Sequence, residues 1–166
     1  MTSIDRLDAD IVALLTDDPR AGVTELAGRL GVTRNTVQAR LQRMVSAGVL
    51  AGYSARVDLD RVGLPVVAFI DLELAQGALQ DVVDELSRLP HVLEVHATTG
   101  RGDLLVRLAA RGHAELQRLL QDVLAVPGVV RTTTHIALSN PVPYRTVPLL
   151  RAMTSTTGRG RAGGVP

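Results

Sequence analysis

The 166-residue sequence contains no cysteine, and aromatic residues make up only 2% of it. Without cysteine the chain forms neither disulfides nor thiolate metal sites, which is typical of proteins from a reducing compartment. Scarce aromatic side chains exclude the stacking platforms that bind single-stranded nucleic acid. The hydrophobic content of 46% is still enough for a packed core, which must be built from aliphatic side chains.

Lysine is also absent, so all 18 basic residues are arginine. A GC-rich coding bias explains this more simply than a function does. The net charge of +1 hides an uneven distribution, because residues 145–166 hold four arginines and no acid. The rest of the chain is mildly acidic, and its basic character is concentrated in one helix, described below.

The sequence has neither a long apolar run nor a recognisable secretory signal. Its apolar stretch at 62–70 is much shorter than the roughly 20 residues that a membrane helix needs. Charged residues at positions 5, 6, 8 and 10 interrupt the region where a signal peptide would be apolar. We therefore expect a cytoplasmic protein without a membrane partner.

The residues also give no pattern typical of a catalytic or metal site. His91, His96, His113 and His135 have no ligand spacing, and the sequence contains no nucleophile triad, phosphate-binding loop or dinucleotide fingerprint. We expect no metal, no cofactor and no catalytic residue.

The segment 25–44 has the pattern of two short helices joined at a glycine. Ala27 is small enough to let the helices approach closely, and Gly31 can adopt the positive φ that ends the first helix. Thr33 precedes the second helix as a candidate N-cap, and Val37 is placed to pack back against the first. This spacing predicts a helix-turn-helix.

The second of these helices contains no acidic residue. Arginine, asparagine and glutamine side chains reach base edges bidentately, and arginine also binds phosphate. The candidate DNA contacts in its first turns, where a recognition helix meets bases, are Thr33, Arg34, Asn35, Thr36 and Gln38. Arg40 and Arg43 are expected to contact phosphate or to form ion pairs with acids of the first helix. An exposed amphipathic helix without a ligand is the alternative.

Apolar periodicity predicts three helices, then a β segment, then an alternation of strands and helices. The helices are expected at 5–15, 24–30 and 34–47, with Val45 in their core, and the short strand at 49–57, as a wing or a bridge. The second half has strands at 66–74, 92–99, 103–109 and 129–138 and helices at 79–89 and 116–124. This βαββαβ order predicts a ferredoxin-like domain.

The expected fold class is thus α+β, with a winged-type helix-turn-helix followed by a ferredoxin-like domain. The expected division is 1–50 for the helix-turn-helix, 51–63 for a β linker, 64–140 for the ferredoxin-like domain and 141–166 for an irregular Pro-, Gly- and Arg-rich tail. Because both faces of the strands carry many apolar residues, we expect two copies to pair through the sheet.

This order of domains resembles the Lrp/AsnC (leucine-responsive or feast/famine) family of transcriptional regulators. The resemblance covers residues 7–138, and the segments that carry it are Leu7–Ile11, Glu25–Ala27, Thr33–Val37 with Arg40 and Leu41, Gly48–Tyr53 and Gly100–Asp103. It implies a regulator that binds double-stranded DNA as a homodimer, often assembled into octamers.

The resemblance also implies a small-molecule effector, usually an amino acid, at a contact between dimers near the glycine-aspartate loop. The candidate effector residues are Thr99, Gly100, Gly102 and Asp103, with Thr134 on the last strand. Glycine N–H groups can bind a carboxylate, and Asp103 could then hold an α-amino group. Many family members have another acid and an aromatic where this loop has Arg101 and Gly102. The residues alone favour a simple hairpin turn for this loop over an effector site.

Two other functions fit parts of the pattern. Some tetrapyrrole decarboxylases share this two-domain architecture, and the four histidines would suit such an enzyme. An architectural DNA-binding protein without an effector is the other alternative, and the arginines of the tail would suit its salt-sensitive binding.

Overall fold

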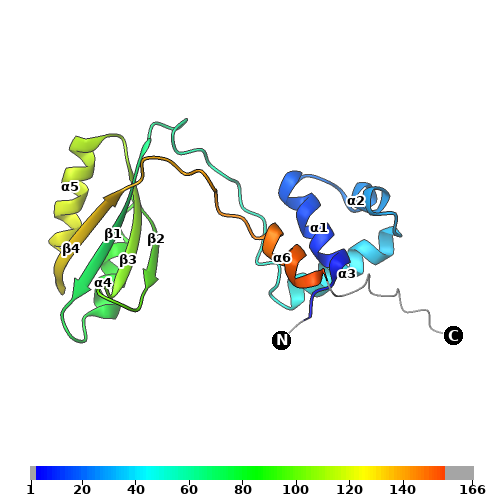
Figure 1. Ribbon diagram of the computed structural model, residues 1–166, viewed down its shortest axis with the longest axis horizontal. Helices are drawn as coiled ribbons and strands as arrows, with labels where there is room; N and C mark the ends of the chain where they lie inside the picture. The colour runs from blue at the N-terminus through cyan, green and yellow to red at the C-terminus, as the bar shows by residue number, and fades with distance from the viewer. Residues whose placement is uncertain (1–2, 156–166) are drawn as a thin grey trace. The chain divides into compact units, whose positions relative to one another are not determined.

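The computed structural model describes residues 3–155, which form two compact units. The helical unit comprises the described residues up to Ala55 together with those from Val142 onward, and the sheet unit comprises Arg56–Pro141 (Figure 1).

Three helices begin the helical unit: α1 (Arg6–Asp17), α2 (Val23–Leu30) and α3 (Arg34–Ser46). Each contributes an apolar stripe to one core, formed by Leu7, Ile11, Leu15, Leu26, Ala27, Val37 and Met44. Gly31 ends α2 in the left-handed conformation with φ +66°, and its N–H donates to the Ala27 and Gly28 carbonyls. The predicted helix-turn-helix is confirmed, because the turn is fixed by local residue choices at the predicted positions.

A fourth helix, α6 (Val147–Thr154), completes the helical unit and packs on α1. It corrects the expectation of an irregular tail, because Pro148 lies in the first helical turn, where the missing proline N–H costs no hydrogen bond. Ala9 and Ala13 face away from the main core yet are buried, and Thr154 of α6 is only 1% exposed. Residues 156–166, the remainder of the predicted tail with Arg159 and Arg161, lie outside the described residues.

The expected strand at 49–57 is wrong, since residues 47–65 contain turns and extended chain but no strand. The Val49 and Leu50 N–H groups both donate to the Met44 carbonyl, at 2.8 and 3.1 Å. Tyr53 and Val57, two apolar residues of this segment, are 61% and 62% exposed. A strand needs a partner to pair its backbone groups, and this segment pairs with none of the four strands of the sheet.

The sheet unit contains β1 (Val66–Leu74), α4 (Leu79–Ser87), β2 (Val92–Ala97), β3 (Leu104–Ala110), α5 (His113–Leu124) and β4 (Val129–Ile136). The strand order is β2-β3-β1-β4, and every neighbouring pair is antiparallel. The predicted ferredoxin-like fold is confirmed.

One face of the sheet carries both helices. Alternate residues of β1 and β3 form its core with α4 and α5, and they are Ala68, Ile70, Leu72, Leu104, Val106, Leu108, Val82, Leu86, Leu116 and Val123. This pattern follows from the period of two along a strand.

The opposite face is less apolar than expected. Phe69 and Leu105 lie there half-buried, but cross-strand ion pairs occupy much of the face. These pairs join Glu73 to Arg131 at 3.7 Å and Glu94 to Arg107 at 3.5 Å, and beside them the His135 imidazole lies 3.2 Å from the Asp71 carboxylate. The expected large apolar patch is therefore corrected to a small apolar strip with charged neighbours. No helix within residues 3–155 is long and apolar enough to span a bilayer.

Candidate nucleic-acid interface and effector loop

One solvent-exposed arc of α3 has a single charged residue, Arg34. Arg34, Asn35, Gln38, Ala39 and Gln42 are all exposed and fall within an arc of about 140° around the helix axis. Val37 and Met44 lie on the opposite side in the core. Val45 was expected in that core, but it is 53% exposed because its helical position is close to those of Arg34 and Gln38.

Thr33 and Thr36 fix the start of α3. The Thr33 hydroxyl oxygen accepts a hydrogen bond from the Thr36 N–H at 3.2 Å and lies 2.8 Å from the Thr36 hydroxyl. This N-cap predicted from sequence is confirmed, and it holds Arg34 and Asn35 in the exposed first turn.

Arg40 and Arg43 point toward α1 instead of the exposed arc. Arg40 Nη1 lies 2.5 Å from Asp5 Oδ2 and 3.3 Å from Asp8 Oδ1, and Arg43 also pairs with Asp8. Of the two roles expected for these arginines, the geometry of the described residues matches ion pairs with the first helix. Burial would raise the pKa of Asp5, but hydrogen bonds from Arg40 and from the Asp8 N–H hold that pKa below its ordinary value.

The loop between β2 and β3 brings four of the five candidate effector residues together. Thr98 closes this loop: its hydroxyl donates to the Gly102 carbonyl at 2.9 Å and its N–H to the Asp103 carbonyl at 3.0 Å. Gly100 has φ +125°, a conformation that favours glycine. Thr99, Gly100, Gly102 and Asp103 thus share one tight turn.

Asp103 fastens this loop to β1. Its N–H donates to the Leu72 carbonyl at 2.8 Å, and its Oδ2 accepts from the Leu74 N–H at 2.7 Å. One carboxylate oxygen of Asp103 is thereby occupied by the protein itself. Gly102 lies so close to β1 that a Cβ would be 3.3 Å from the Asp71 Cβ.

Asp71 is a candidate that the sequence reasoning missed. Its carboxylate lies beside Gly102 and pairs with His135 on β4. The alternating acids in β1 were the signal, but only the register of three strands brings Asp71 to the loop. Thr134, in contrast, lies on β4 opposite Ile70 on the helix-covered side, with β1 between it and the loop.

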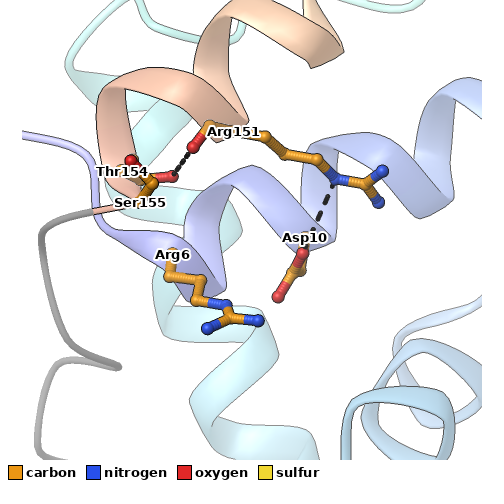
Figure 2. Close-up of a pocket in the computed structure, with 5 residues that line it drawn as sticks. All are labelled: Arg6, Asp10, Arg151, Thr154 and Ser155. Carbon is orange, nitrogen blue, oxygen red and sulfur yellow. Dashed lines mark hydrogen bonds and ion pairs between the residues drawn. The ribbon is translucent and has the colours of Figure 1, made fainter.

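A groove of about 460 Å³ lies between α1 and α6 (Figure 2). Arg6, Asp10, Arg151, Thr154 and Ser155 line it. Arg151 Nε lies 3.9 Å from Asp10 Oδ1, and the Thr154 hydroxyl donates to the Leu150 carbonyl at 2.8 Å. The Arg151–Asp10 contact joins the two helices, and Figure 2 shows Arg151 reaching across to Asp10.

The histidines of the sheet unit do not converge. His91 Nδ1 lies 2.8 Å from the Ala109 carbonyl oxygen, whereas His96 and His135 belong to the two edge strands. Three inter-strand spacings separate those edges by about 14 Å. Within residues 3–155, no three His, Cys, Asp or Glu residues are grouped to hold a metal.

Two family models match the chain. Residues 4–45 match the AsnC-type helix-turn-helix domain, and residues 67–147 match the Lrp/AsnC ligand binding domain. Together they cover both units.

Curated relatives are also transcriptional regulators. The HTH-type transcriptional regulator FL11 of Pyrococcus horikoshii is 29% identical over 135 residues, which is 81% of this chain and 89% of the relative. An uncharacterised HTH-type transcriptional regulator of Pyrococcus abyssi is 31% identical over 137 residues, with 82% and 87% coverage.

Solved structures share the fold. AsnC of E. coli superposes with a TM-score of 0.82 at 28% identity, over 89% of this chain and all of that one (100%). The Neisseria meningitidis regulator NMB0573, solved as a complex with L-Met, has a TM-score of 0.79 at 24% identity, with 84% and 93% coverage. The chain belongs to the Lrp/AsnC family of DNA-binding transcriptional regulators.

Proposed function

We propose that this regulator recognises a specific duplex sequence through the exposed face of α3, and that a small effector, an amino acid, modulates this binding from the β2–β3 loop. The observation that carries the proposal is the acid-free exposed arc, which a correctly capped helix-turn-helix presents to solvent.

The exposed arc has the side chains that read bases. Arginine pairs bidentately with guanine, and asparagine and glutamine pair bidentately with adenine. From Arg34 to Gln42 the helix rises about 12 Å, the length of three to four base-pair steps. Arg34, Asn35 and Gln38 lie in the first turns, where a recognition helix approaches the major groove, and Thr33 and Thr36 hold those turns.

Two copies of the chain would read two half-sites. We propose that they pair through the helix-free face of the sheet, around Phe69 and Leu105, and assemble further into octamers as the family resemblance implies. A dimer favours a pseudo-palindromic operator with half-sites about 34 Å apart. Chromosomal DNA as the partner places such a regulator in the cytoplasm of a bacterium or archaeon.

The effector proposal is supported by the match to a ligand binding domain and by the geometry of the loop. Thr99, Gly100 and Gly102 offer backbone N–H groups to a carboxylate. Asp71 lies beside Gly102 and adds a second acid near Asp103 that could pair with an α-amino group. Thr134 faces the helices and is the weakest member of the proposed set. Effector binding would change the assembly or the spacing of the DNA-binding units.

The DNA-binding proposal is tested by replacing Arg34 and Asn35 with alanine. Each lost bidentate base contact costs about 1–3 kcal/mol, so we expect the double variant to lose specific binding to a duplex selected from a random pool. Arg118→Ala, which removes one exposed arginine from α5, is the control and should bind normally. Solution mass should be unchanged in both variants. An unaltered affinity of the double variant would refute this assignment.

The effector proposal is tested by thermal-shift screening against the twenty amino acids, L-methionine included, combined with solution mass measurement. Gly102→Val should abolish the response, because its side chain would collide with Asp71 and the Leu72 carbonyl. Gly112→Ala is the matched control, since a Cβ there meets no atom within 4 Å. A normal response of the valine variant would remove this loop from the effector site.

We propose further that the protein is not an enzyme. Its curated relatives are transcriptional regulators, and two of the four histidines that would suit a tetrapyrrole decarboxylase, His96 and His135, lie apart on the two edge strands. A colour change on adding a porphyrin would contradict this. Binding that depends steeply on salt but not on sequence would instead indicate an architectural protein.

A further inference from the structure

We propose that Asp5 and Asp8 of α1 are positioning residues for DNA recognition. They bind Arg40 and Arg43, fix the rotation of α3 about its own axis, and withhold both guanidinium charges from the DNA phosphates. The inference rests on the proposed DNA-binding role of α3.

The four side chains form one network, here called the acid clamp. Asp5 caps α1 by accepting from the Asp8 N–H at 3.1 Å, and Asp8 accepts from the Asp5 N–H at 3.0 Å. The two carboxylates also accept from Arg40 and Arg43, which are more than 30 residues away in the sequence: Arg40 contacts Asp5 Oδ2 and both oxygens of Asp8, and Arg43 contacts the Asp8 Oδ2 that also accepts from the Asp5 N–H. The beginning of α1 is thereby joined directly to the flank of α3.

Because its carboxylates are buried, the acid clamp fixes the orientation of α3 about the helix axis. The Asp8 side chain is 1% exposed, and those of Asp5 and Arg40 are 15% and 16% exposed. A buried carboxylate that loses its partner carries a large desolvation cost, so α3 cannot rotate without exposing or unpairing these charges. The apolar contacts of Val37 and Met44 also hold α3, but hydrophobic burial is not directional. The clamp therefore selects which residues form the exposed arc.

The clamp also changes how α3 attracts DNA. Of the three arginines in α3, two are neutralised by Asp5 and Asp8, and only Arg34 has no carboxylate partner among residues 3–155. Non-specific attraction to phosphate depends on free cations, whereas base recognition depends on orientation. The clamp thus lowers non-specific affinity and maintains specific affinity.

The test compares Asp8→Asn with Asp17→Asn, which removes the same charge from an exposed position at the other end of α1. Affinity is measured against salt for the duplex selected by the wild-type protein and for an unrelated duplex. We expect Asp8→Asn to steepen the salt dependence by about one ion, because Arg43 loses its carboxylate partner and reaches a phosphate, whereas Arg40 keeps its ion pair with Asp5. The ratio of specific to non-specific affinity should fall about tenfold, as for one lost base contact. Asp17→Asn should leave both quantities close to the wild type.

Arg43→Gln covers the case in which Asp8→Asn does not fold, because the Arg43 side chain is 45% exposed and Arg40 keeps both of its partners. The clamp predicts an unchanged salt dependence for Arg43→Gln. A salt dependence shallower by about one ion would assign Arg43 to phosphate and overturn the inference. Equal behaviour of folded Asp8→Asn and Asp17→Asn would also overturn it. A wild-type protein that prefers neither duplex would instead refute the proposed function.

Discussion

At the scale of single residues, Glu115 joins the first turn of α5 to the residue that precedes the N-cap. The N-cap position is Gly112, which has no side chain to accept a hydrogen bond. Glu115 instead folds back and accepts from the Arg111 N–H at 2.6 Å, while Arg111 Nη2 lies at 2.6 Å and Nε at 2.9 Å from its other oxygen. Hydrogen bonds from the Arg111 side chain and backbone lower the pKa of Glu115 from 4.5 to about 2.

This lowered pKa makes the stability of the sheet unit dependent on pH in acid. A carboxyl group whose folded pKa lies below its unfolded pKa stabilises the fold above the unfolded value, and this stabilisation is lost as pH falls toward the folded value. We expect Glu115→Gln to be less stable than the wild type at pH 6, and the difference to shrink between about pH 4.5 and pH 2. Urea unfolding across this range measures it, and a difference independent of pH would contradict the assignment.

The structural role of a residue could be predicted from the sequence where its partners are close to it in the sequence. Gly31 and Thr33 act within a few residues of themselves, so the sequence was enough to place the turn and the cap. For Arg40 and Arg43 the sequence left two roles open, phosphate contacts or ion pairs with acids of the first helix, because the choice depends on how α1 packs across α3. Val45 was misplaced because apolar type was weighed above helical position, and on α3 an apolar residue also occupies the exposed arc.

At the scale of elements, α6 is the addition that distinguishes the helical unit from a bare helix-turn-helix. Its removal would uncover Ala9 and Ala13 of α1 and discard the buried Thr154. We expect a chain ending at Asn140 to lose on the order of 2 kcal/mol of stability in its helical unit, the scale of one or two buried aliphatic side chains. Thermal unfolding followed by helical circular dichroism measures this loss.

The matched control is a chain ending at Ser155, which keeps α6 and should melt as the full chain does. Equal melting of the two truncated chains would show that α6 adds nothing to the helical unit.

The regular elements of the sheet unit were predictable because each strand and helix has an unbroken apolar period. The segment at 49–57 also has an apolar pattern, but it is not a strand. A strand must pair with a neighbouring strand, and the residues of a segment do not show whether such a neighbour is present. The helix α6 was not predicted because the three prolines at 141, 143 and 148 indicated an irregular segment. Only the last of them lies within the helix. A proline that ends one helix can equally begin another.

At the scale of the whole molecule, the chain leaves the helical unit once and returns to it. The segment after α3 leads into the sheet unit, and residues 137–146 lead from β4 back to α6. The expected division set residues 141–166 apart from the helix-turn-helix, whereas the structure joins the described residues from Val142 onward to the helical unit. Sequence pattern alone does not say on which unit a late helix packs.

The return of the chain to α1 has a consequence for biosynthesis. Translation proceeds from the N-terminus, and domains near it generally fold first. Here α1 emerges early, but the helix that covers Ala9 and Ala13 is made only after the last strand of the sheet unit. The synthesis of the helical unit therefore starts before that of the sheet unit and ends after it.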